Sequence, residues 1–192
     1  MILTSLWLTG RNNELTARNS LLIAYNQQCL HLNIQTHQIM YNFLLGLHNL
    51  LRWVILLLLI INLLRHIAAV NKPFGASDKK LGLILMIFAH IQLLIGLYEW
   101  FAGSWGLQNF MNNGAEVMRN SASRFFAVEH TVGMIVAIIL ITVARGVYRK
   151  NIPDGKKHRR CILLYTFALL IILAMIPWPG MYEFGRNLVP AF

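Results

Sequence analysis

The sequence has few charged residues and almost no cysteine, and each shortage argues against a class of protein. Charged side chains make up only 12% of the 192 residues, whereas soluble domains carry about 25% and disordered chains need high charge with low hydrophobicity. The two cysteines, Cys29 and Cys161, lie in no CxxC or Cys/His pattern, which argues against a disulfide framework and a cysteine-based zinc site. No P-loop, dinucleotide fingerprint, GxSxG or HExxH motif is present. Hydrophobic residues reach 57% instead, which favours an integral membrane protein.

Four long apolar blocks predict four membrane spans. They occupy about residues 43–65, 81–101, 124–144 and 161–177, and each is close to the ~20 residues that cross ~30 Å of hydrocarbon. A span has to be helical because lipid offers its backbone no hydrogen-bond partner. We therefore expect an all-α protein, an integral membrane four-helix transmembrane bundle within residues 40–179, followed by a short C-terminal tail over residues 180–192.

Residues 1–39 differ from the rest of the chain. They are rich in Asn, Gln, Thr and Leu and have no clear hydrophobic period. Met40 stands directly before the first span. We therefore expect translation to start at Met40 and residues 1–39 to be a mis-annotated or disordered N-terminal extension. The alternative is a real, weakly ordered external arm.

Basic residues are concentrated in two connections and predict the orientation. The segment 65–80 contains Arg65, Lys72, Lys79 and Lys80, and the segment 145–160 contains Arg145, Arg149, Lys150, Lys156, Lys157, Arg159 and Arg160. Lysine and arginine mark the cytoplasmic side, so we expect these loops in the cytoplasm and both termini outside a bacterial inner membrane. The net charge of +10 then indicates anionic membrane lipids as partners and requires no nucleic acid.

Ionisable residues within the spans direct attention to function, because each costs roughly 2.5–3.5 kcal/mol at a helix centre. One face of the first span carries His48, Arg52, Ile55, Leu59, Asn62 and His66, at steps of three and four. The second span carries His90 near its middle, with Gln92, Gly96 and Glu99 on the nearly opposite side, and the third begins with Glu129 and His130. Depth places His48, Arg52, Glu99, Glu129 and His130 in the outer half, and His66 and His158 at the cytoplasmic border.

This set of residues fits a haem site, since bundles hold haem through imidazoles from facing helices. We expect one haem b, ligated by two of His48, His90 and His130, with Arg52 and Arg124 near its propionates. Depth favours His48 with His130 as the ligands of the haem iron, and His90 with His130 comes second.

Plainer interpretations of the same residues stay open. The histidines are then hydrogen-bonded packing residues, and Arg52 forms an ion pair with Glu99 or Glu129. The two acids could also carry protons for quinone chemistry. A zinc or copper site at His48, His130 and Glu129 is a further alternative.

Several motifs together resemble a known set of proteins. They are LHNLLRW in the first span, AHIQLLIGL in the second, RFFAVEHTVGMIVAIILITVARG in the third and LLIILAMIPWP at the end. Over residues 40–179 the chain resembles small four-span bacterial membrane proteins of about 150 residues that are commonly labelled "cytochrome B". The resemblance implies a b-type haem protein whose span histidines are His48, His90 and His130, with Arg52 as its arginine and Glu129 as the acid before the third-span histidine.

The expected function is membrane-bound electron transfer through the haem. We expect an electron carrier or a subunit of an oxidoreductase more than a stand-alone enzyme, and we assign no catalytic residue. A quinol or a redox protein would be its partner, and the chain could form a homo-oligomer or a complex. The alternatives are a small transporter or proton-coupled permease, with Arg52, Glu99 and Glu129 along a polar path, and a structural or assembly subunit with a buried ion-pair network.

Overall fold

The computed structural model describes residues 2–180, with side chains from residue 18 onward, and every regular element in that range is helical. The elements are α1 (Ile2–Ala68), α2 (Ala76–Ala102), α3 (Leu107–Asn113), η1 (Gly114–Met118), α4 (Ser121–Arg124), η2 (Phe125–Glu129), α5 (His130–Gly146), η3 (Val147–Arg149) and α6 (Asp154–Met175). The chain divides into two compact units, Met1–Asn42 and Phe43–Phe192. The division falls inside α1.

The first unit consists of the N-terminal part of α1. Its backbone is helical from Ile2 onward, although the sequence has no hydrophobic period there. A helix forms its backbone hydrogen bonds within itself, so it does not require an apolar face. The side chains of residues 18–40 are exposed, and the Thr36 hydroxyl donates to the Leu32 carbonyl oxygen at 2.9 Å within the same helix. A translation start at Met40 stays a prediction.

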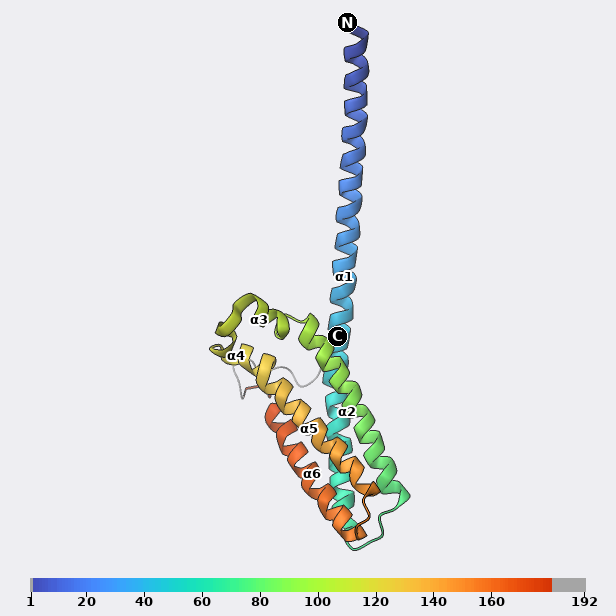
Figure 1. Cartoon of the computed structure of the whole chain (residues 1–192), viewed down its shortest axis with the longest axis vertical. Helices are drawn as coiled ribbons and strands as arrows, with labels where there is room; N and C mark the ends of the chain where they lie inside the picture. Colours follow the sequence, from blue (N-terminus) through green and yellow to red (C-terminus); the bar gives the residue numbers. More distant parts are fainter. Residues whose placement is uncertain (1, 181–192) are drawn as a thin grey trace. The chain divides into compact units, whose positions relative to one another are not determined.

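The second unit is a bundle of four helices, which confirms the expected all-α architecture. Figure 1 shows α2, α5 and α6 side by side with the part of α1 that follows residue 43. Each helix contributes to one buried apolar core. Leu59 of α1, Leu85 of α2, Ile141 of α5 and Ala168 of α6 are all 0% exposed. The predicted inward face of the first span is confirmed, since Ile55, Leu59, Asn62 and His66 are buried.

The four long helical segments have the length and composition of membrane spans. They are Arg18–Ala68, Ala76–Met118, Ser121–Arg149 and Asp154–Met175. Large apolar side chains also cover the outside of the bundle, among them Leu57, Leu94, Leu163 and Leu170, which are 56–68% exposed. An apolar outer surface of this extent is typical of helices that face lipid. The chain therefore has the construction of a multi-pass membrane protein.

Polar first turns lengthen the helices beyond the predicted spans. α2 begins at Ala76 and α6 at Asp154, earlier than the apolar blocks at residues 81 and 161. Each has an aspartate in its first turn, where a negative charge is favoured by the helix dipole. α6 ends at Met175, shortly before Pro177, because proline cannot continue the backbone hydrogen bonds.

Candidate functional site

Histidines gather at two places in the bundle, near opposite ends of its α1 segment. His48 and His130 form the first group, which we call the histidine pair. His66, Asp78 and His158 form the second, which we call the His66 cluster. His48 and His66 share the inward face of α1, and at a rise of about 1.5 Å per residue they lie about 27 Å apart along the helix.

His48 is positioned by contacts between α1 and α2. Its Nδ1 atom lies 3.5 Å from Glu99 Oε2, and the two side chains are 19% and 14% exposed. The Gln92 side-chain amide donates to the His48 carbonyl oxygen at 2.9 Å. Gly96 allows this approach, since a Cβ atom there would lie 3.1 Å from His48 Cε1. The polar stripe of the second span therefore packs against His48.

His130 is positioned by contacts between α5 and α6. Its Nδ1 donates to the Met175 carbonyl oxygen at 2.8 Å, and its ring centroid lies 5.9 Å from that of Phe125. His130 begins α5 directly after η2, which is a π-helical turn. Such turns occur frequently at functional sites because they reorient the side chains beside them.

The two rings of the histidine pair lie close together. Their centroids lie 6.3 Å apart, with 45° between the ring planes. An imidazole nitrogen lies about 2 Å from a metal ion that it ligates, so two rings on opposite sides of one ion have centroids about 6 Å apart. The spacing is compatible with two imidazoles that would together hold one metal ion. The hydrogen bond at His130 Nδ1 and the Glu99 carboxylate 3.5 Å from His48 Nδ1 leave Nε2 of each ring as the candidate ligating nitrogen, which is a common arrangement in metal-binding histidines.

The other sequence candidates are distributed around the pair. Arg52 lies one turn further along α1, is partly buried, and has its guanidinium carbon 5.3 Å from the Trp53 ring centroid. Glu129 accepts from Arg124 Nε at 2.6 Å, and both side chains are about 40% exposed. This ion pair joins α4 to η2 across a short stretch of chain. Glu99 contacts one member of the pair, and Glu129 contacts Arg124.

The structure does not bring His90 to the histidine pair. Its ring lies on the exposed side of α2, and its Nδ1 donates to the Met86 carbonyl oxygen of the same helix at 2.8 Å. Gln92, Gly96 and Glu99 occupy the side of α2 that meets His48. Of the three histidines considered as ligands, His48 and His130 are therefore the two that lie together.

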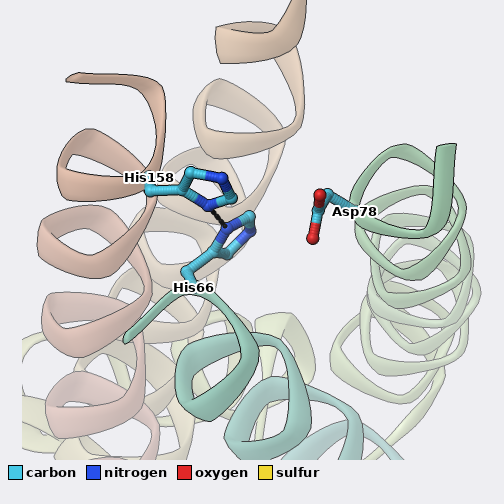
Figure 2. Close-up of side chains that lie close together, drawn as sticks. All are labelled: His66, Asp78 and His158. Atoms are coloured by element: carbon cyan, nitrogen blue, oxygen red, sulfur yellow. Dashed lines mark hydrogen bonds between the residues drawn. The ribbon is translucent and has the colours of Figure 1, made fainter. Parts of the chain in front are cut away.

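The His66 cluster is a site that the sequence analysis did not identify. Figure 2 shows the His66 and His158 rings joined through their Nδ1 atoms, which lie 2.8 Å apart, with Asp78 on the neighbouring helix beside them. The three residues are 0–3% exposed, and one potential ligand atom from each lies within 4.8 Å of the other two. Both histidines were predicted at one end of the spans, but a shared depth did not reveal that they pair.

Further contacts hold the His66 cluster in place. Asp78 accepts from Arg65 Nε at 2.7 Å through Oδ1 and from the Gly75 backbone N–H at 2.8 Å through Oδ2. The His66 ring stacks between those of Phe74 and Tyr165, with centroids 5.5 and 5.7 Å away. Each acceptor oxygen and each ring is thereby held in one orientation.

A small cavity adjoins this cluster. Its lining includes His66, Asp78, Gly82, Arg145, Cys161 and Tyr165. The bundle thus contains two groups of imidazoles, a partly buried one between α1 and α5 and a fully buried one where α1, α2 and α6 meet. Comparisons with protein-family models, with curated proteins and with solved structures found no match to this chain.

Proposed function

We propose that this chain is a membrane-bound b-type cytochrome that holds one haem between His48 and His130. The observation that carries the proposal is the 6.3 Å separation of the two ring centroids, which is the spacing of two imidazoles on opposite sides of one iron. The rings belong to different helices, α1 and α5, as in other cofactor sites built inside helical bundles. A bound haem b would supply one-electron redox chemistry.

The residues around the histidine pair support this function because they orient the two candidate ligands. The Met175 carbonyl oxygen orients His130, and the Glu99 carboxylate lies beside His48. A carboxylate or carbonyl at the second ring nitrogen fixes the orientation of a ligating histidine and strengthens it as a ligand. Arg52, one turn from His48, is the residue proposed to bind a haem propionate.

The charge of the loops supports an orientation for this electron carrier. Segments 65–80 and 145–160 hold most of the basic residues, so we place them on the cytoplasmic side of a bacterial inner membrane. The histidine pair then lies toward the outer side. Electrons would pass between a membrane quinol or reductase and an acceptor at that face. The motifs shared with the proteins labelled "cytochrome B" support the same function.

Visible spectroscopy tests the proposal directly. The full chain is expressed in a haem-replete host, purified in detergent, and measured as a dithionite-reduced minus oxidised spectrum together with a pyridine haemochrome assay. We expect a sharp reduced α-band and about one haem per chain. His48→Ala and His130→Ala should each lose the haem.

His90→Ala is the matched control because His90 is exposed on α2 and bonds within its own helix. It should retain the haem. A colourless wild-type protein would refute the cytochrome, and the ion pairs of the bundle would then indicate a transport path or a structural network. Undiminished haem in the His130→Ala variant would refute the ligand assignment.

A further inference from the structure

We propose that the His66 cluster binds one divalent first-row transition-metal ion, such as Zn²⁺, through His66, His158 and Asp78. This inference does not rest on the haem. Two imidazoles and a carboxylate are a common set of three protein ligands for such ions. The three residues come from different helices, since His66 lies in the last turn of α1, Asp78 in the first turn of α2 and His158 in the second turn of α6.

The candidate ligand atoms lie close enough together that a moderate movement of the side chains would bring them to one metal ion. One candidate ligand atom from each residue lies within 4.8 Å of the others. The two Nδ1 atoms are 2.8 Å apart, so a single proton lies between them when no ion is bound. Metal–nitrogen bonds of about 2 Å require the two nitrogens to separate by only a fraction of an ångström. As the ion binds, that proton moves to the Nε2 atom of the same ring, so both imidazoles stay neutral and ligate through Nδ1.

Burial provides an independent reason to expect a ligand here. His158 is 0% exposed, and its Nε2 atom is buried without a hydrogen-bond partner. A buried polar atom in that state costs about 1–3 kcal/mol. A structure that only required a packed helix junction would be more stable with an apolar side chain at this position. The retained imidazole therefore indicates a role for its other nitrogen, Nδ1, which faces His66 inside the cluster.

The groups around the three ligands are suited to orient them. Each oxygen of Asp78 accepts one hydrogen bond, from Arg65 or from Gly75, and keeps a second acceptor site for an ion. Stacking between Phe74 and Tyr165 holds the His66 ring in its plane. The adjoining small cavity, which both His66 and Asp78 line, would hold a single water molecule as a fourth ligand.

The ligand set also predicts which ions are rejected. Mg²⁺ and Ca²⁺ require oxygen ligands, and Asp78 is the one carboxylate of the cluster. Imidazole favours zinc, copper, iron and nickel. Arg65, which pairs with Asp78, partly neutralises that carboxylate, so charge alone does not make this a general cation site.

Metal analysis of the full chain tests the inference. The protein is prepared in detergent without a histidine tag, stripped with EDTA, dialysed against Zn²⁺ and analysed for bound metal. Calorimetric titration then gives the affinity. We expect about one Zn²⁺ per chain and no binding of Mg²⁺. His66→Ala and His158→Ala should each weaken Zn²⁺ binding more than 10-fold, the range for disrupting a metal site. His90→Ala should leave it unchanged.

Two further variants keep the test decisive. Asp78→Asn keeps the shape of the side chain and removes its charge, so it should weaken Zn²⁺ binding even if the alanine variants do not fold. His130→Ala should bind Zn²⁺ like the wild type, which separates this site from the histidine pair. Failure of the wild-type protein to bind Zn²⁺ would overturn the inference, as would full binding by a folded Asp78→Asn or His158→Ala variant. Haem content, measured on the same samples, is expected to be independent of both results.

Discussion

Two leucines of α1 that lie two residues apart differ strongly in burial. We therefore predict that replacing them with alanine lowers the free energy of unfolding by very different amounts. Leu59 is 0% exposed within the core, whereas Leu57 is 60% exposed on the outside of the bundle. Replacing each with alanine removes the same atoms from the same helix. The pair therefore separates the effect of packing from that of helix propensity.

The expected loss of unfolding free energy depends on the fact that the outside of the bundle contacts lipid and not water. Lipid is as apolar as leucine, so association of membrane helices gains little from apolar transfer and depends on packing. Leu57→Ala should therefore cost less than about 0.5 kcal/mol. Leu59→Ala leaves a cavity of about 80 Å³, and at about 24 cal/mol per Å³ this costs about 2 kcal/mol.

Unfolding in mixed detergent and lipid micelles provides the measurement. Circular dichroism follows the loss of helical structure as SDS is increased, and the free energy of unfolding is compared among wild type and the two variants. If Leu57→Ala and Leu59→Ala lowered the free energy of unfolding equally, the assignment of Leu59 to the packed core and Leu57 to the lipid-facing surface would be refuted. A larger cost for Leu57→Ala would show that this surface faces another protein chain and not lipid.

Two other features of the described residues give clear expectations. A thiol-reactive maleimide should label Cys29, which is exposed, and not Cys161, which is buried, and mass spectrometry of the folded protein measures both. Gly96→Leu should displace His48, since even a Cβ atom would lie 3.1 Å from its ring, and should lower haem content more than about 10-fold. Gly146→Ala is the control, since an added Cβ there meets nothing within 4 Å. It should leave haem content unchanged and raise the free energy of unfolding by about 0.5–1 kcal/mol. Full haem content in the Gly96→Leu variant would contradict the proposed positioning of His48.

The parts of the fold that depend on hydropathy and helical period could be predicted from the sequence. The four apolar blocks gave the four helices of the bundle, because membrane-spanning backbone must be helical. Steps of three and four placed Leu59, Asn62 and His66 on one buried face of α1. Depth along the spans placed His48 and His130 at the same end of the bundle, near the start of two helices that run in the same direction, and their ring centroids lie 6.3 Å apart.

The parts that depend on helix rotation and on local irregularity could not be predicted. His66 and His158 pair because α6 is rotated to point His158 toward α1, and that rotation is set by packing across the whole bundle. The π-helical turn before His130 has no signal in the apolar pattern. The sequence could have excluded His90 as a partner of His48. His90 lies on the side of its helix opposite to Gln92, Gly96 and Glu99, which are the residues that meet α1.

Separation along the bundle makes the two histidine groups energetically independent. The 18 residues from His48 to His66 span about 27 Å at the standard helical rise, and the buried core residues Ile55, Leu59 and Leu85 fill the region between. Substitutions more than 7–10 Å apart that share no partner add within about 0.3–0.5 kcal/mol.

Independence has a direct test in the His130→Ala, His158→Ala double variant. Its change in the free energy of unfolding should equal the sum of the two single changes within about 0.5 kcal/mol. The Zn²⁺ affinity of His130→Ala and the haem content of His158→Ala should both match the wild type. A coupling above about 1 kcal/mol would mean that the core between the sites has two arrangements, because a chain of close-packed side chains with a single arrangement cannot transmit a preference from one site to the other.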